Sequence, residues 1–185
     1  MTLPEVAAPT SVRRLGILVG CVLALGLSLT WAFLSMRAVM GVGGACADGG
    51  PYVSAQPCPD GAVLIAFAVP LMLVASMLGS AVALSLSAPN LLVPMWAILF
   101  GSLGWNFLEY GVTGDGLVWG WIVCGVVFWA MAFPAVYAMA LGLRLTLAPP
   151  DRTTQPEGAR KWWVLYPLIG AAGAALGWVS FDALS

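Results

Sequence analysis

Five stretches of this chain are free of charged residues for about as long as a helix needs to cross a membrane. The apolar core of a bilayer is roughly 30 Å thick, which corresponds to about 20 residues of α-helix. The stretches are residues 15–34, 62–87, 91–108, 117–143 and 162–181. They predict an all-α fold, a polytopic transmembrane helical bundle with five spans. Four spans are the alternative, because the last stretch is short and rich in alanine and glycine.

The composition agrees with a membrane protein and argues against several functions. Hydrophobic residues make up 61% of the 185 positions and charged residues 8%, whereas soluble proteins contain about half apolar and a quarter charged residues. The chain has no histidine, the commonest metal ligand and general base. A net charge of −1 without an extended basic patch argues against nucleic acid as a partner. We therefore expect no catalytic residue, no metal and no cofactor, and a lipid bilayer as the surroundings.

The basic residues orient the predicted bundle, because Lys and Arg are enriched on the cytoplasmic side of membrane proteins. With five spans and the N-terminus inside, six of the seven lie inside: Arg13, Arg14, Arg144, Arg152, Arg160 and Lys161. Only Arg37 lies outside, and the opposite orientation would reverse this ratio. We therefore predict a cytoplasmic tail, residues 1–14, and one transmembrane domain, residues 15–185. Within that domain we expect an external loop at 37–61 and a cytoplasmic loop at 144–161.

The first apolar stretch has two other interpretations, a cleaved signal peptide and a lipidated N-terminus. Residues 45–47 (ACA) have the small-x-small form of a cleavage site, and residues 18–21 (LVGC) are similar to a lipidation box. However, the run at 15–34 is longer than the apolar core of about 7–15 residues in a signal peptide. Cys21 is also followed by further apolar residues, where a mature lipoprotein usually turns polar. We therefore favour a retained first span.

The predicted external loop contains the segment GGACADGGPYVSAQPCPDG, residues 43–61, with Cys46 and Cys58 twelve positions apart. Thiols on the oxidising side of a membrane pair readily, so a structural disulfide is the favoured interpretation. Zinc is disfavoured because two cysteines without histidine do not complete four ligands. A redox-active pair remains an alternative, although such pairs usually have the form C-x-x-C.

A second group of polar residues occurs at the predicted outer end of the third span, in the segment GWNFLEYG, residues 104–111. Asn106 and Glu109 are three positions apart and therefore share one helix face. Arg37, the only external cation, ends the first span at a similar depth. We predict an Arg37–Glu109 pair that ties the two helices together. A ligand or proton site is one alternative, since ionisable residues in membrane segments are often functional. A contact with another protein at the membrane interface is the other.

Small residues recur at every fourth position in two predicted spans, a spacing that lets helix backbones approach closely. The series are Gly16, Gly20, Ala24, Ser28 and Ala32 in the first span and Ala75, Gly79, Ala83 and Ser87 in the second. Shorter pairs are Ala97 with Gly101 and Gly173 with Gly177. We interpret these series as packing faces within one bundle, with homodimerisation as the alternative.

The loop pattern GGxCAxGGPYxxAxPCPDG, followed by LGWNFLEYG, resembles small uncharacterised multi-pass integral membrane proteins of actinobacteria. The resemblance covers most of the chain and implies a bacterial cell membrane. It implies no activity and no functional residue.

Three functions are compatible with these features. The favoured one is a non-enzymatic accessory or scaffold subunit that presents a disulfide-closed external loop and contacts other membrane proteins or itself. The second is a small oligomeric transporter or channel with Asn106 and Glu109 at its mouth. The third is a membrane thiol-disulfide oxidoreductase that uses Cys46 and Cys58.

Overall fold

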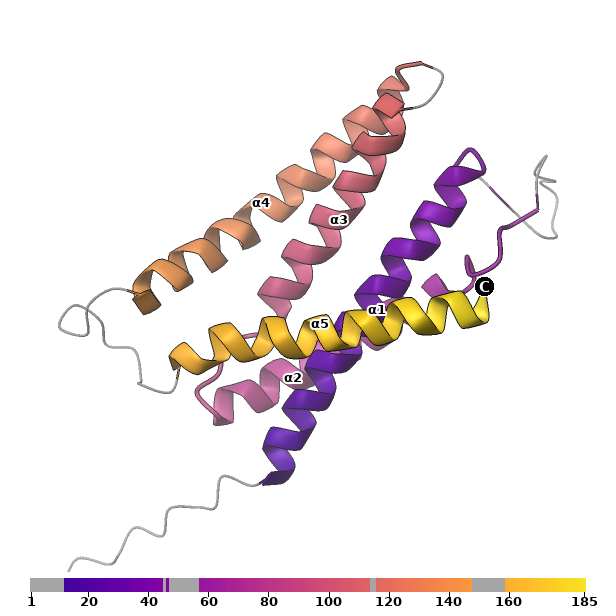
Figure 1. Cartoon of the computed structure of the whole chain (residues 1–185). Coiled ribbons are helices and arrows are strands. Elements are labelled where there is room, and N and C mark those ends of the chain that lie inside the picture. Colours follow the sequence, from indigo (N-terminus) through magenta and orange to yellow (C-terminus); the bar gives the residue numbers. More distant parts are fainter. Residues whose placement is uncertain (1–11, 45, 47–56, 114–115, 148–158) are drawn as a thin grey trace, which may run out of the picture.

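The computed structural model describes residues 12–44, 46, 57–113, 116–147 and 159–185. These residues form five α-helices and no strand, so the all-α prediction is confirmed (Figure 1). The helices are α1 (Val12–Gly41), α2 (Leu64–Ser85), α3 (Leu92–Thr113), α4 (Trp119–Leu147) and α5 (Ala159–Leu184). Most of the predicted tail and of the cytoplasmic loop lies outside the described residues, as does segment 47–56 of the external loop.

Each predicted span corresponds to one helix, but the five helices are not equally suited to a membrane. Within the described residues, α1, α2, α4 and α5 are long and apolar enough to cross one, and α5 has the lowest mean hydropathy of these four. Helix α3 is not among them. Its 22 residues span about 33 Å as a helix, so length is not the reason. Asn106 and Glu109 lie in its last two turns and reduce its apolar character.

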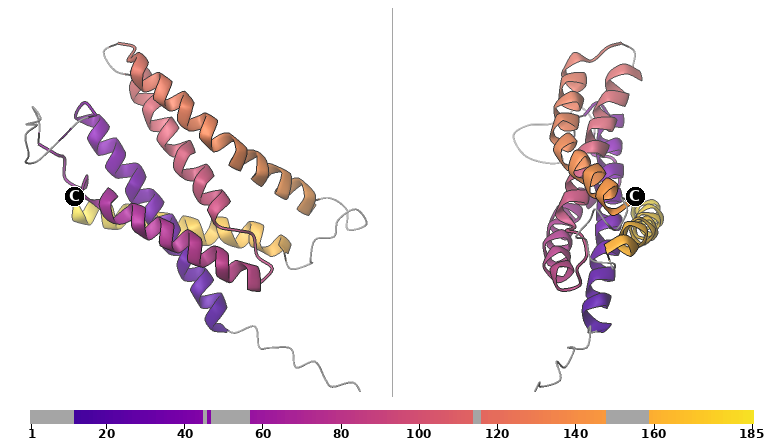
Figure 2. Two further views of the ribbon diagram at one scale, coloured as in Figure 1. Left: turned by 180° about the vertical axis from the view of Figure 1, so that it is seen from behind. Right: turned by 90° about the vertical axis from the view of Figure 1, so that its left-hand side faces the viewer.

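The helices form two groups (Figures 1 and 2). Helix α1 lies between α2 and α5 and has extensive contacts with both. Helices α3 and α4 pack along each other as an antiparallel hairpin. The hairpin is joined to the first group mainly through contacts between α3 and α1, whereas α4 and α5 contact each other only briefly.

The helix termini gather at two ends of the molecule. At one end, which we call the disulfide end, α1 finishes, α2 starts, α3 turns into α4 and α5 finishes. There Gly61 approaches the Phe181 ring, and the rings of Tyr110 and Trp121 lie 6.2 Å apart. At the opposite end, the basic end, the Tyr166 hydroxyl of α5 donates to the carbonyl of Pro89, which precedes α3. Helices α1, α3 and α5 therefore run in one direction and α2 and α4 in the other.

The buried core lies around α1 and towards the basic end. It contains a cluster of apolar side chains from four helices and the α2–α3 connection: Leu18, Val22, Leu25, Leu29, Met72, Leu91, Met95 and Trp162. By contrast, most large apolar side chains of α4 are exposed, including Phe133 and Tyr137. An apolar helix with so little burial in protein requires an apolar environment, and a bilayer provides one.

Glycines set the distance between α1 and α5 where the two helices cross. A Cβ atom at Gly173 would collide with the backbone of Leu23, and one at Gly26 with the carbonyl oxygen of Gly170. The predicted Gly173 and Gly177 pair therefore packs against α1. The predicted α1 series is only partly correct, because a Cβ at Gly16 or Gly20 would meet nothing within 4 Å. The crossing point lies further along α1, at Gly26.

A second close approach occurs within the α3–α4 hairpin. A Cβ at Gly104 would collide with the Trp129 ring, and one at Gly125 would lie 3.0 Å from the Gly104 carbonyl oxygen. A Cβ at Gly101, which the sequence pattern favoured, would have no neighbour within 4 Å. The Gly101 carbonyl instead accepts a hydrogen bond of 3.2 Å from the Trp129 indole.

Candidate functional site

The Arg37 guanidinium lies between α1 and α3 at the disulfide end and contacts two side chains of α3. Its two terminal nitrogens donate to the two carboxylate oxygens of Glu109 at 2.6 and 2.9 Å. One of them also donates to the Asn106 amide oxygen at 3.2 Å. A two-point contact between guanidinium and carboxylate is geometrically specific and stronger than a single charged contact. The structure thus brings together the three residues that the sequence singled out.

Asn106 holds this polar contact against the α1 backbone. Its side chain is fully buried, and its amide nitrogen donates to the Phe33 carbonyl at 3.3 Å while its oxygen accepts from Arg37. A buried amide without partners would be costly. Here both ends of the Asn106 side chain are bound to α1, so this residue fixes the register between α1 and α3.

Aromatic rings enclose the Arg37 guanidinium. It lies 5.6 Å from the Phe33 ring centroid and 5.4 Å from that of Tyr110, within the range of favourable cation–π contacts. The Tyr110 hydroxyl donates to the Arg37 carbonyl at 3.3 Å, which adds a further contact between α3 and the α1 backbone.

The local sequence explains why α3 presents these groups together. Asn106, Glu109 and Tyr110 are related by spacings of three and four residues, which place them on one face of a helix. The side chains of Arg37 and Glu109 are each 31% exposed. Both oxygens of Glu109 are bound to Arg37, so this carboxylate is held as an acceptor and is poorly placed to exchange protons or to bind a ligand. The arrangement is suited to joining helices.

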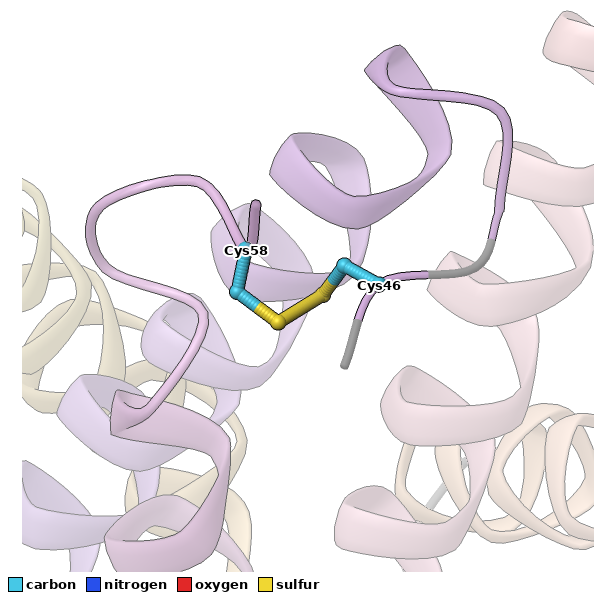
Figure 3. The surroundings of a disulfide bond; sticks show 2 residues. All are labelled: Cys46 and Cys58. Atoms are coloured by element: carbon cyan, nitrogen blue, oxygen red, sulfur yellow. A yellow bond between two sulfur atoms is a disulfide. The ribbon is translucent and has the colours of Figure 1, made fainter. Parts of the chain in front are cut away.

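The disulfide lies at the same end of the molecule and joins the segment after α1 to the segment before α2 (Figure 3). Cys46 and Cys58 are bonded, with their Cα atoms 4.8 Å apart. The buried Ser35 hydroxyl of α1 donates to the Gly61 carbonyl at 2.9 Å, and Gly61 has φ of 83°, a conformation that glycine adopts most easily. The start of α2 is therefore attached to α1 by a covalent bond and by a hydrogen bond.

Replacing both loop cysteines by serine is expected to lower the free energy of unfolding by about 2 kcal/mol, towards the lower end of disulfide contributions. The effect is modest because inserted helices already restrict the unfolded chain. Thermal unfolding in detergent measures the loss, with Cys124→Ser, an exposed free cysteine, as the control. Alkylation of Cys46 and Cys58 without reductant, in protein taken from its own membrane, would contradict the disulfide.

Within the part of the chain that the structure describes, no group of three or more His, Cys, Asp or Glu residues could hold a metal ion. Cys21 is buried, and a Cβ at Gly79 would lie 3.0 Å from its Cβ, whereas Cys124 is exposed on α4. Neither lies in a cluster that suggests chemistry.

One feature that the sequence did not indicate is an apolar cavity of about 700 Å³. It lies between the α1–α5 pair on one side and α3 and α4 on the other, towards the basic end. Its wall includes Trp162 and Trp163 of α5 and residues of the α2–α3 connection. A possible signal was the pair Trp162-Trp163 directly after Arg160 and Lys161, a combination of aromatic and basic residues that is common at membrane interfaces.

Comparison with known proteins gives no relative: no protein-family model, no curated protein and no solved structure matches this chain.

Proposed function

We propose that this chain is a multi-pass integral protein of a bacterial cell membrane. In this proposal it acts as a non-enzymatic accessory or scaffold subunit that presents the disulfide-closed loop outside. The helix directions support five crossings, because α3 runs in the same direction as α1 and α5 and opposite to α2 and α4 (Figure 1). Arg144, Arg160 and Lys161 lie at the basic end, which the enrichment of Lys and Arg inside assigns to the cytoplasm.

The observation that carries the scaffold role is the position of the charges. In the described helices, every charged residue lies within six residues of a helix end: Arg13, Arg14, Arg37, Glu109, Arg144, Arg160, Lys161 and Asp182. Moving ions or protons through a bilayer generally requires polar or charged groups facing the bundle interior near its middle. The polar groups at the disulfide end, Arg37, Asn106 and Glu109, bind one another and therefore support assembly rather than transport.

A reporter fused after Ser185 is expected outside, and a reporter inserted between Asp151 and Arg160 inside. A third, inserted after Gly116 in the α3–α4 connection, is expected outside if α3 crosses. Enzymatic reporters that are active on only one side of the membrane measure all three. The first two on the same side would show that α5 does not cross. The third on the inside would show the same for α3.

The scaffold role is tested by comparing the purified chain with the chain in its own membrane. Reconstituted alone in liposomes, it is expected to produce no flux of protons or small ions above protein-free vesicles. Cross-linked in its own membrane and extracted in mild detergent, it is expected to retain another membrane protein, or a second copy, in a fixed ratio. Cys46→Ser with Cys58→Ser should reduce that ratio, and Cys124→Ser should not. Flux from the chain alone would favour the transporter, and a trapped mixed disulfide at Cys46 or Cys58 the oxidoreductase.

A further inference from the structure

The apolar cavity has the size of a ligand site and is open to its surroundings. Its volume of about 700 Å³ lies within the range of roughly 300–1,000 Å³ that is usual for small-molecule sites. Four helices line the cavity, with residues that include Leu29 of α1, Ile98 of α3, Ala138 of α4 and Ala171 of α5. Ile98 is 51% exposed, and Ala138 and Ala171 are exposed. An apolar space that opens between helices in a bilayer is accessible to lipid chains.

The hydroxyl groups of the wall bind carbonyl groups of the chain itself. The Thr30 hydroxyl donates to the Gly26 carbonyl, the Ser102 hydroxyl to the Leu99 carbonyl and the Tyr166 hydroxyl to the Pro89 carbonyl. By contrast, Trp162 is 3% exposed, and its buried indole nitrogen has no hydrogen-bond partner among the described residues. A buried donor of this kind normally finds an acceptor, so we expect near Trp162 an acceptor that is not among the described residues.

The charges around Trp162 indicate the chemistry of that acceptor. Arg160 and Lys161 directly precede it in the first turn of α5, and the Lys161 ammonium lies 5.6 Å from the Trp162 ring. The last turn of α4, which contains Arg144, lies close to the same place, because a Cβ at Gly142 would lie 3.1 Å from the Trp163 ring. Basic sites between transmembrane helices at the cytoplasmic side bind anionic lipid head groups.

We propose that the cavity binds one anionic glycerophospholipid. An acyl chain lies along the apolar walls, and the phosphate lies at the basic end, near Arg160 and Lys161 and within reach of the Trp162 indole. The proposal rests on the membrane location given above and not on the scaffold role. Size argues against a helix as the occupant. An α-helix about 10 Å across would fill this volume with roughly six residues, less than two turns. A single acyl chain is much thinner.

Ala171→Trp is expected to fill the cavity and expel the lipid. Its matched control is Ala172→Trp, because Ala172 is an exposed neighbour in α5 that does not line the cavity. Each variant is placed in nanodiscs of dioleoyl phosphatidylglycerol or dioleoyl phosphatidylcholine and released into a native mass spectrometer. Wild type and Ala172→Trp should each retain one phosphatidylglycerol. In Ala171→Trp, the ratio of lipid-bound to lipid-free protein should be at least about tenfold lower than in wild type.

The head-group contact has its own test. A basic residue near an anionic surface contributes on the order of a fivefold change in affinity. Arg160→Gln with Lys161→Gln should therefore reduce the preference for phosphatidylglycerol over phosphatidylcholine by about 25-fold. Trp162→Phe, which removes the donor but keeps a ring, should reduce it by less. Arg13→Gln with Arg14→Gln, on α1, is the charge-matched control and should leave the preference closer to that of wild type.

If Ala171→Trp fails to give a monodisperse protein, Ala138→Trp on the opposite wall replaces it, with the exposed Ala140 as control site. Equal phosphatidylglycerol retention by the cavity and control variants would overturn the site. Equal retention of both lipids by wild type would overturn the proposed preference for an anionic head group. Displacement of the lipid by a second copy of the chain would overturn the assignment of the occupant. None of these results would by itself contradict the scaffold role.

Discussion

Arg37→Gln is expected to lower the free energy of unfolding by about 2 kcal/mol. Removing one partner of a fully buried ion pair costs about 3–5 kcal/mol, whereas exposed pairs contribute about 1 kcal/mol or less. The two side chains here are 31% exposed, so an intermediate value applies. The substitution leaves Glu109 without its partner and removes the donor to Asn106. Thermal unfolding in detergent measures the loss.

Glu109→Gln and the double variant complete a thermodynamic cycle. Glu109→Gln leaves the guanidinium without a counter-charge and should have an effect similar to that of Arg37→Gln. The double variant removes both charges and should be only slightly less stable than either single variant, because the two side chains act as one unit. Arg144→Gln and Asp182→Asn change exposed charges and should each have an effect within about 0.5 kcal/mol.

The cycle also separates the scaffold from the transporter. Additive losses in the double variant would show that Arg37 and Glu109 act independently, and the structural reason for a charge at position 109 would then be lost. A transporter would give another pattern. Glu109→Gln would abolish flux in liposomes without loss of stability, and Arg37→Gln would not reproduce this result.

Features that depend on local spacing could be predicted from the sequence. Asn106 and Glu109 share a helix face because of their separation, and Arg37 reaches them because the counted spans place it at the same depth. The disulfide follows in the same way, from two cysteines in one connection between helices. The apolar runs predict five helices, but the third run ends at residue 108. The helix continues to Thr113 and therefore includes Glu109, which lowers its apolar character.

Features that depend on how the helices cross could not be predicted. The pattern of a small residue at every fourth position predicts a packing contact at Gly16 and Gly20 as readily as at Gly173. However, Gly16 and Gly20 face open space, whereas Gly173 contacts α1. The difference arises from the position of the α5 crossing, and sequence periodicity does not contain that position. The cavity has the same origin. It exists because the α3–α4 hairpin contacts α1 near Arg37 and touches α5 only briefly, although each helix alone is an ordinary apolar segment.

The crossing of α1 and α5 leads to the second large effect. Gly173→Ala is expected to lower the free energy of unfolding by about 3 kcal/mol or more, at or beyond the upper end of typical overpacking costs. The new methyl group would collide with the carbonyl oxygen, carbonyl carbon and Cα of Leu23. Backbone atoms cannot rotate away as a side chain can, so the helices must separate. Separation would also strain the 2.9 Å hydrogen bond from the Trp31 indole to Ser180. Thermal unfolding in detergent measures the change.

Gly170→Ala is the matched control for Gly173→Ala, because it lies one turn earlier on α5 and its Cβ would meet nothing within 4 Å. Alanine is a better helix former than glycine by up to about 1 kcal/mol, so this variant should be as stable as wild type or slightly more stable. Equal losses for the two variants would mean that the close crossing is absent in the folded protein. A selective loss at Gly173 would instead show that α5 is held against α1 by backbone contact. Gly26 and Gly170, which meet at the same crossing, line the cavity, so Gly173→Ala should also reduce the number of lipids retained.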